Sequence, residues 1–432
     1  MWNKTYKTII IEEIWTSHLR SPFVCKKLRM YLELKLNYII RMSPSKPMLI
    51  DTEEDDQILI SQLESVILSM LDGTKTEEMV QNDILSELQI TSEKEKKTVI
   101  DNISNIVDHF SPYIDIREKP SKRSAFVYGD LSQEIPYELS IELTDRCLLE
   151  CKHCYKEAGN YGHKFINTER LIDFLRKVKN KVHTIQLTGG EAMMHPEFEI
   201  ILNYCKNNFN EVVVSTTGLL INRDNVDCFK GTRVYISLYS FDPLENEEYV
   251  GKDVLEKILS AIKLLKRKEI HVCINTIVSN RNVENLSQFI NKCEELQVDG
   301  VGLEKNTLVG RAKNLNYDEH CSDNCELCVR KIEESFMSDK MYLSTFISDT
   351  LPNELRCGYY KWIINEEENI MPCAFFPKDF SLGNISDPIE SILNQEKYNE
   401  MIEKLIKWAK ELKLTGESIT DVCEALYLVD EM

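Results

Sequence analysis

The feature that most constrains the fold is a regular alternation of strand-like and helix-like segments between residues 138 and 304. Short runs rich in Val, Ile and Thr are separated by stretches with apolar residues at helical spacing, for example 168–179 and 255–268. Repeated βα units predict a parallel sheet, because consecutive parallel strands need a crossover connection. We expect a six-stranded α/β partial barrel of the TIM-like type, with its chemistry at the carboxyl ends of the strands. The expected strands are 138–144, 183–188, 211–216, 233–240, 270–278 and 299–304.

The regions on either side of this barrel have different patterns. Residues 38–118 contain two β-prone pieces and then three helical stretches, which predicts a winged-helix-like α+β domain. A basic segment, 1–37, precedes it, and 117–133 has the composition of a linker to the barrel domain at 135–313. From 314 to 432 the alternation stops and cysteines cluster, which predicts a small cysteine-rich C-terminal unit with a helical tail.

Composition excludes some classes of function for this chain of 432 residues. Its formal charge of -19 argues against sequence-independent nucleic-acid binding, which needs a basic face that displaces counterions from phosphates. No apolar run is long enough to span a bilayer, and the first residues lack a secretory signal pattern. We therefore expect a cytoplasmic protein with no membrane span.

Fourteen cysteines in a reducing compartment are expected to be metal ligands or buried thiols rather than disulfides. Isolated cysteines on apolar or mixed stretches are expected to pack as small core residues. These are Cys25, Cys205, Cys228, Cys273 and Cys293.

The first barrel strand is followed by Cys147, Cys151 and Cys154 in CxxxCxxC spacing. Three thiolates on one short loop suit a four-iron four-sulfur cluster, whose fourth iron keeps an open position for a small molecule. A zinc site is the alternative, but zinc loops usually pair cysteines as CxxC with a second pair or with histidines. His153 is available as such a ligand, although its place between two cysteines favours the surface of the loop.

This loop, with the aromatic Tyr155 after its third cysteine, resembles the defining motif of the radical SAM superfamily, and the resemblance spans about residues 138–310. After the second strand, Gly189-Gly190-Glu191 looks like the family's GGE motif for the amino group of S-adenosylmethionine (SAM). Glycines let the backbone approach a ligand, and a carboxylate complements an ammonium.

Four further positions resemble places where family members contact SAM or carry a characteristic segment. The alternative for each is the ordinary polarity of strand ends. They are Thr217, in a TTG that replaces the frequent TNG, Ser237, Asn275, and Arg311 of a GRA segment.

The resemblance implies a 4Fe–4S cluster on the three cysteines, SAM bound at its open iron, and hydrogen abstraction from the substrate by a 5′-deoxyadenosyl radical. It also implies an electron donor such as flavodoxin or ferredoxin.

Downstream, Cys357 and Cys373, followed by an LGN segment, resemble the auxiliary-cluster region, called SPASM or twitch, of radical SAM peptide maturases. The similarity is greatest to the sactipeptide maturases of the subtilosin type. Two departures exclude a complete two-cluster SPASM domain: Glu368 stands where a glycine is expected, and only Cys423 remains of the cysteine-rich continuation.

A second CxxxCxxC motif, which precedes Cys357 and Cys373 in the sequence, adds three more thiols. With Cys357 and Cys373 they suffice for one auxiliary 4Fe–4S cluster, and a zinc knot or a second open cluster are the alternatives. They are Cys321, Cys325 and Cys328.

The N-terminal domain resembles, in its order of elements, the peptide-chaperone fold of pyrroloquinoline-quinone biosynthesis, the recognition element of many peptide maturases. An exposed edge strand near 48–51 is expected to accept a leader peptide as an added strand. A dimerisation or packing domain is the alternative.

Together these features predict a radical SAM maturase of a ribosomally made precursor peptide, recognised through its leader and given a cysteine thioether crosslink, as in bacteriocin biosynthesis. Carbon–carbon crosslinking and epimerisation are alternatives within the same class. A zinc-stabilised peptide-binding protein is the alternative outside it.

Overall fold

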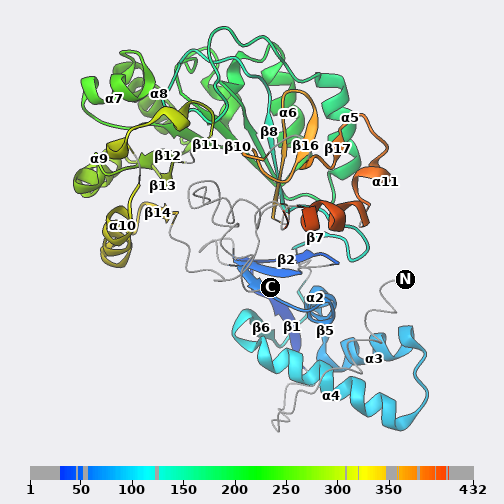
Figure 1. Ribbon diagram of the computed structural model, residues 1–432. Coiled ribbons are helices and arrows are strands. Elements are labelled where there is room, and N and C mark those ends of the chain that lie inside the picture. The colour runs from blue at the N-terminus through cyan, green and yellow to red at the C-terminus, as the bar shows by residue number, and fades with distance from the viewer. Residues whose placement is uncertain are drawn as a thin grey trace. The chain divides into compact units, whose positions relative to one another are not determined.

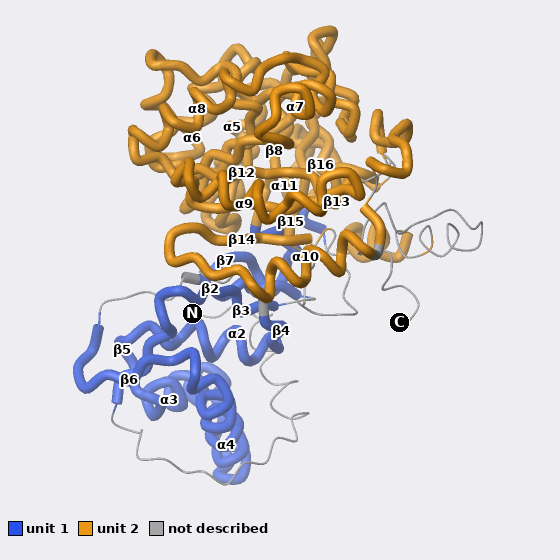
Figure 2. The backbone as a smooth tube through the Cα atoms, turned by 90° about the vertical axis from the view of Figure 1, so that its left-hand side faces the viewer, with its two compact units in different colours: residues 1–137, 393–395 blue, residues 138–392, 396–432 orange. Residues whose placement is uncertain are grey.

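The computed structural model describes most of the chain, in two compact units. The described residues are 30–44, 47–51, 57–121, 126–306, 309–319, 321–346, 358, 360–376, 380–394, 396–404 and 407. Unit 1 comprises residues 1–137 and 393–395, and unit 2 comprises residues 138–392 and 396–432 (Figure 2). Within the described ranges, no helix combines the length and the apolar content that a bilayer crossing requires.

The described residues of unit 1 form two small sheets and three α-helices. The three-stranded antiparallel sheet has the order β5-β1-β6, and the four-stranded sheet has the order β4-β3-β2-β7, with β7 parallel to β2. The strands are β1 (Tyr31–Leu34), β2 (Tyr38–Met42), β3 (Met48–Asp51), β4 (Gln57–Leu59), β5 (Asp72–Thr76), β6 (Ile114–Arg117) and β7 (Phe126–Gly129). The helices are α2 (Gln62–Ser69), α3 (Glu77–Leu88) and α4 (Glu93–His109).

The three predicted helices of this unit are confirmed to within a few residues. Ser61 and Glu64 form a capping box at the start of α2, and the Thr76 hydroxyl caps α3 by accepting from the backbone of Met79. Helix α4 is amphipathic and buries one stripe in the core that it shares with α2 and the sheets. Its buried apolar residues are Val99, Ile103, Ile106 and Val107.

Two expectations for this region were wrong. The predicted edge strand β3 is an inner strand, because β2 and β4 pair with its two sides, so the described edges are β4 and β7. The segment 117–133 is not simply a linker, since it supplies β7. Strand β1 lies in the segment 1–37, of which residues 1–29 lie outside the described residues.

Unit 2 is built on one ten-stranded sheet of order β14-β13-β12-β11-β10-β9-β8-β15-β16-β17 (Figure 1). The strands from β14 to β15 are parallel, and β16 and β17 continue antiparallel. They are β8 (Glu138–Glu142), β9 (Thr184–Thr188), β10 (Glu211–Thr216), β11 (Arg233–Ser237), β12 (His271–Val278), β13 (Gly300–Lys305), β14 (Tyr342–Thr345), β15 (Lys361–Ile364), β16 (Asn369–Met371) and β17 (Gly383–Asn384).

The α/β partial barrel is confirmed, and its six predicted strands are β8 to β13. The connections hold helices with buried apolar faces, as a crossover helix on a parallel sheet requires. These helices are α5 (Thr168–Val178), α6 (Phe198–Asn208), α7 (Pro243–Val250), α8 (Leu255–Arg267), α9 (Leu286–Glu295) and α10 (Asp323–Ser335). The short helix α11 (Ile389–Ile392) follows β17. The sequence did not predict β14 and β15, which extend the parallel sheet at both ends.

Candidate active site

The three cysteines of the first motif lie on the connection between β8 and α5, at the carboxyl end of the first barrel strand. All three thiols are free. Burial raises the pKa of Cys147 to about 11 and that of Cys151 to about 12, and the Cys147 and Cys154 thiols raise the pKa of Cys151 further. Cys147 is buried and the other two cysteines are half-buried. Three such thiols repel one another as thiolates and need a cationic partner, and iron in a cluster provides one.

Arg311 holds this loop in place rather than pointing away from it. Its guanidinium donates from Nε to the Cys151 carbonyl at 2.8 Å, from Nη2 to the Ala158 carbonyl at 2.7 Å and from Nη1 to the Tyr161 hydroxyl at 3.2 Å. Its backbone N–H donates to the Cys154 carbonyl. The predicted cofactor-binding arginine is therefore a clamp on the cysteine loop.

The GGE segment follows β9 and packs directly against the same loop. Gly189 has a left-handed φ of 131°, and a Cβ at Gly190 would lie 2.3 Å from the carbonyl oxygen of Arg146. The N–H groups of Gly190 and Glu191 donate to the carbonyls of Thr144 and Arg146. Only glycines allow the chain after β9 to approach the cysteine loop this closely.

The Glu191 carboxylate is fully buried and occupied by internal hydrogen bonds. One oxygen accepts from the Thr216 hydroxyl at 2.7 Å and from the Met193 N–H, and the other accepts from the backbone N–H and hydroxyl of Thr217. Glu191 and Thr217, both predicted site residues, are thus brought together. Their contact joins the segment after β9 to the segment after β10.

Ser237 and Asn275 also lie side by side, as neighbours in the register of β11 and β12. The Ser237 side chain hydrogen-bonds Tyr239, and burial, together with the nearby Cys151 thiol, raises the pKa of the Tyr239 phenol well above its usual value. Tyr239 in turn lies 4.5 Å, ring centre to ring centre, from His153. The sequence did not single out Tyr239, although it follows Ser237 by only two residues.

His153 is half-buried, whereas a place on the surface of the loop was expected. Burial lowers the pKa of its imidazole to about 4. Its Nδ1 and the Nε of Arg146 are buried polar atoms without a hydrogen-bond partner. Orphaned donors and acceptors beside the cysteine loop are what a site shaped for a bound group contains.

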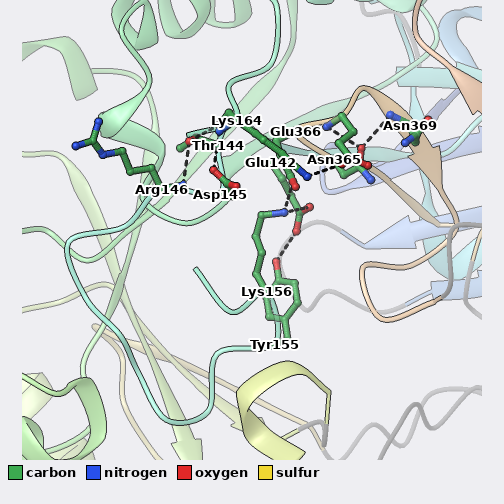
Figure 3. A network of polar contacts seen from close by, with 11 residues as sticks. Glu142, Thr144, Asp145, Arg146, Tyr155, Lys156, Lys164, Asn365, Glu366 and Asn369 are labelled. Atoms are coloured by element: carbon green, nitrogen blue, oxygen red, sulfur yellow. Dashed lines mark hydrogen bonds and ion pairs between the residues drawn. The ribbon is translucent and has the colours of Figure 1, made fainter. Parts of the chain in front are cut away.

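Tyr155 faces the end of β8 in a buried polar network (Figure 3). Its hydroxyl donates to Glu142 at 2.7 Å, and Lys156 bridges Glu142, at 2.6 Å, and Glu366. Burial alone would lower the pKa of Lys156, but the two carboxylates raise it above its usual value. Lys156 therefore stays charged and ties the cysteine loop to the turn between β15 and β16.

This turn pairs three consecutive glutamates with three basic residues of the connection around the cysteine loop. Beyond the Glu366–Lys156 pair, Glu367 pairs with Lys164 at 2.5 Å and Glu368 pairs with Arg170 at 2.6 Å. Glu368 has a left-handed φ of 70°, which explains why a glycine is expected there. The run of three glutamates is visible in the sequence, but its partners are not, because they lie some 200 residues away.

The cysteines of the C-terminal unit fall in two places. Cys325 and Cys328 lie on the first turns of α10, and Cys321 precedes the helix and hydrogen-bonds the Cys325 thiol. Cys373 follows β16 and is close enough to the Tyr155 phenol to raise its pKa. Cys357 lies outside the described residues.

Of the isolated cysteines, Cys205, Cys273 and Cys293 are buried as expected, whereas Cys228 is only partly buried. Cys25 lies outside the described residues.

In the part of the chain that the structure describes, no three His, Cys, Asp or Glu side chains converge as ligands of a single metal ion would. A four-iron cluster does not require such convergence, since each thiolate binds a different iron.

Comparison with known proteins agrees with this geometry. The profile of the Radical SAM superfamily matches residues 141–293, which include the cysteine loop, the GGE segment and strands β9 to β12. The chain is 26% identical over 342 residues to the antilisterial bacteriocin subtilosin biosynthesis protein AlbA of Bacillus subtilis, covering 75% of this chain and 74% of AlbA. It is 24% identical over 274 residues to the sporulation killing factor maturation protein SkfB of the same organism, covering 60% of this chain and 65% of SkfB.

Among solved structures, Streptococcus suis SuiB bound to S-adenosylmethionine aligns with a TM-score of 0.59 at 16% identity. The alignment covers 85% of this chain and 90% of SuiB, so the fold is shared over most of both proteins. The matching profile, which contains the three clustered cysteines, identifies residues 141–293 as a radical SAM domain.

Proposed function

We propose that this protein is a maturase that uses radical SAM chemistry to form a cysteine thioether in a ribosomally synthesised precursor peptide. The observation that carries the proposal is the cysteine loop after β8, packed against the GGE segment after β9 at the open end of the barrel. The peptide substrate is supported by the relatives, since AlbA is by name a bacteriocin biosynthesis protein, SkfB is by name a killing-factor maturation protein, and SuiB was solved with its precursor peptide SuiA.

The residues of the barrel fit the cofactors of the family, a 4Fe–4S cluster and SAM. Cys147, Cys151 and Cys154 would hold the cluster, and the Gly189-Gly190 backbone would face the SAM amino group. When bound, these groups supply hydrogen-atom abstraction through a 5′-deoxyadenosyl radical. We assign polar contacts with SAM to Ser237 and Asn275.

Three of the candidate cofactor-binding residues, Glu191, Arg311 and Tyr155, also position the site. Glu191 joins two loops through Thr217, while Arg311 and Tyr155 fix the cysteine loop. Their geometry supports roles in shaping the site, because their polar atoms are already used within the chain.

We assign the C-terminal cysteines to one auxiliary 4Fe–4S cluster that would accept an electron or bind the substrate thiolate. The adjacent Cys321 and Cys325 support this, as does Cys373 beside the cysteine loop. We include Cys328 and Cys357 as further candidate ligands. A flavodoxin or ferredoxin would supply electrons, and a cytoplasmic location suits the free state of the described cysteines.

Unit 1 would bind the leader of the precursor peptide by adding a strand to an open sheet edge, for which β4 and β7 are the candidates in the larger sheet. Hydrogen exchange tests this role, because an added strand protects the amides of the edge that it joins. Protection confined to unit 2 would contradict it.

The chemical outcome is tested by co-expressing the enzyme with a short cysteine-bearing candidate precursor peptide and analysing the peptide by mass spectrometry. We expect a loss of two hydrogens per link together with thiols that no longer react with iodoacetamide. Loss of two hydrogens with reactive thiols would indicate a carbon–carbon link, and an unchanged mass with altered stereochemistry would indicate epimerisation. Either result contradicts thioether formation.

A further inference from the structure

Strand β12 carries one polar residue in a row of buried apolar ones. Successive side chains of a strand point to opposite faces, so Thr276 shares its face with Val272, Ile274 and Val278 rather than with Asn275. The two valines and the isoleucine are fully buried. Thr276 is 1% exposed, and its hydroxyl has no hydrogen-bond partner among the described residues. A buried hydroxyl without a partner weakens the fold, so we expect this one to serve a contact that the chain alone does not supply.

Thr276 lines a cavity of about 180 Å³ at the carboxyl ends of β11 and β12. The walls come from the segment after β11, from helix α7 and from the segment that runs from Arg281 into α9. Among the wall residues Thr276 is the most deeply buried. An apolar cavity of about 150 Å³ holds one benzene molecule, so this cavity has room for a single aromatic ring.

Four aromatic rings from three segments line the cavity. Tyr239 and Tyr249 stack with 5.5 Å between their ring centres, and Phe241 and Phe289 pack at 5.2 Å with their planes tilted by 54°. Tyr249 and Phe289 are buried. Aromatic rings attract one another in offset or edge-to-face arrangements at such distances. The walls therefore favour an aromatic ligand over an aliphatic one.

The hydroxyl of Thr276 is the buried wall group whose hydrogen-bonding capacity the described chain leaves unused. The other polar wall residues that are at least half-buried have hydrogen-bond partners within the chain. They are Tyr239, Ser240, Tyr249 and Asn282. A water molecule beside Thr276 would find one such unused group, whereas buried waters usually make about three hydrogen bonds. An aromatic ring with one hydroxyl suits the cavity better, because its ring meets the walls and its hydroxyl can reach Thr276.

The charges at the rim of the cavity balance. Asp242 and Glu245 supply two carboxylates, and Arg281 and Lys292 supply two cations. The Lys292 ammonium lies over the Phe241 ring at 5.4 Å from its centre. A rim without net charge selects neither an anion nor a cation, so we expect a neutral ligand.

We propose that this cavity is a binding subsite for a phenol ring, and that it receives a tyrosine side chain of the bound precursor peptide. The phenol hydroxyl pairs with the Thr276 hydroxyl, and the ring packs against Phe241 and Phe289. Phenylalanine would leave the Thr276 hydroxyl unpaired, and the bicyclic ring of tryptophan exceeds a cavity for one ring. The peptide part of this inference rests on the proposed function.

Tyr239 connects the cavity to the cysteine loop. It lines the cavity, and its ring centre lies 4.5 Å from that of His153 within the loop. Cavity and loop both lie at the carboxyl ends of barrel strands. A tyrosine anchored in the cavity would therefore hold the peptide beside the candidate active site.

The binding test uses the full-length, cluster-loaded protein with p-cresol, the tyrosine side chain without its backbone, and with toluene, which lacks the hydroxyl. Ligand-observed NMR titrations measure the two dissociation constants. We expect saturable binding of p-cresol that weakens about fivefold in Thr276→Val, because one hydrogen bond is lost, and equal binding of toluene by both proteins. Absence of saturable p-cresol binding, or equal p-cresol binding by both proteins, would overturn the proposal.

Thr232→Val is the matched control, since Thr232 is also buried but its hydroxyl donates to the Phe229 carbonyl at 2.7 Å. This variant should bind p-cresol as wild type does. Without ligand, Thr232→Val should lower the thermal unfolding midpoint, whereas Thr276→Val should not, because it removes no hydrogen bond within the chain. An equally lowered midpoint for Thr276→Val would mean that its hydroxyl already has a partner, which contradicts the proposal.

The peptide test co-expresses the enzyme with a candidate precursor that contains one tyrosine, and with the same peptide carrying phenylalanine at that position. Wild type should link the tyrosine peptide about fivefold more than the phenylalanine peptide, and Thr276→Val should link both equally. Equal linking of the two peptides by wild type would overturn the assignment of tyrosine. If p-cresol binding depends on Thr276 while wild type links neither peptide, the proposed function fails and the phenol subsite stands.

Discussion

At the scale of single residues, the clamp formed by Arg311 decides whether the cysteine loop is ready to bind a cluster. A guanidinium is planar and rigid, so it can donate at once to two carbonyls and a phenol that face it from different directions. A lysine ammonium carries the same charge but cannot satisfy three such acceptors in fixed geometry. Arg311 thus contributes hydrogen-bond donors in fixed directions as well as a positive charge.

We expect Arg311→Lys to lower the iron content of the reconstituted protein to half or less of the wild-type value. The reason is that a loop with unsatisfied carbonyls no longer holds its three thiols in position. Iron and sulfide per chain, measured after anaerobic reconstitution, check this. The exposed Arg223→Lys should reconstitute normally, and full iron content in Arg311→Lys would show that the clamp is dispensable.

At the scale of elements, the turn between β15 and β16 acts as a charged anchor for the connection between β8 and α5. Lys156 is buried between Glu142 and Glu366, so its removal would leave two buried carboxylates without a cation. Removing one partner of a buried ion pair lowers the free energy of unfolding more than removing both partners, because the remaining charge stays desolvated.

Lys156→Met should therefore lower the free energy of unfolding by about 3 kcal/mol. Adding Glu366→Gln should recover part of this loss, since one buried charge is removed with its partner. Urea unfolding of the wild type, both single variants and the double variant gives the double-mutant cycle that measures the coupling. Additive losses would mean that the two side chains are not coupled.

His183, at the start of β9, gives a pH dependence with a defined sign. Burial, together with Arg233, lowers the pKa of its imidazole to about 4. The ordinary pKa of about 6.5 holds in the unfolded chain. Between pH 6.5 and pH 4 the unfolded chain therefore binds a proton that the folded chain does not, so the free energy of unfolding falls as the pH falls through this window. Above about pH 6.5 the imidazole is neutral in both the folded and the unfolded chain, so His183 adds no pH dependence to the stability.

For a shift of this size the loss is at most about 3 kcal/mol, and it is complete below about pH 4. The variant His183→Gln should flatten the decline of the urea midpoint between pH 7 and 4.5, whereas the exposed His163→Gln should not. Parallel declines in wild type and His183→Gln would exclude His183 as the cause.

At the scale of the whole molecule, the parts that sequence predicted are those set by local pattern. The six strands β8 to β13 and the helices α2 to α4 follow from periodicity and capping residues such as Thr76. The three cysteines were identified by their spacing. Each of these signals lies within a few residues of the chain.

What the sequence did not predict depends on distant partners. Strand β15 is short and takes its place by pairing with β8, more than 200 residues earlier. Strand β3 was expected at an edge because the pairing of the short β4 has no local signature. Likewise, the motifs that contain Glu191 and Arg311 do not reveal the internal hydrogen bonds that these side chains make with distant parts of the chain.

The central claim is that the loop after β8 holds the iron on which SAM is cleaved. The most direct measurement is 5′-deoxyadenosine formed by the anaerobically reconstituted full-length chain with SAM and dithionite, compared with Cys147→Ala, Cys151→Ala and Cys154→Ala, and with Cys228→Ala as the control outside the loop. We predict product from wild type and from the control, and a loss of at least a hundredfold in each loop variant. Wild-type yields from any of the three loop variants would contradict the account.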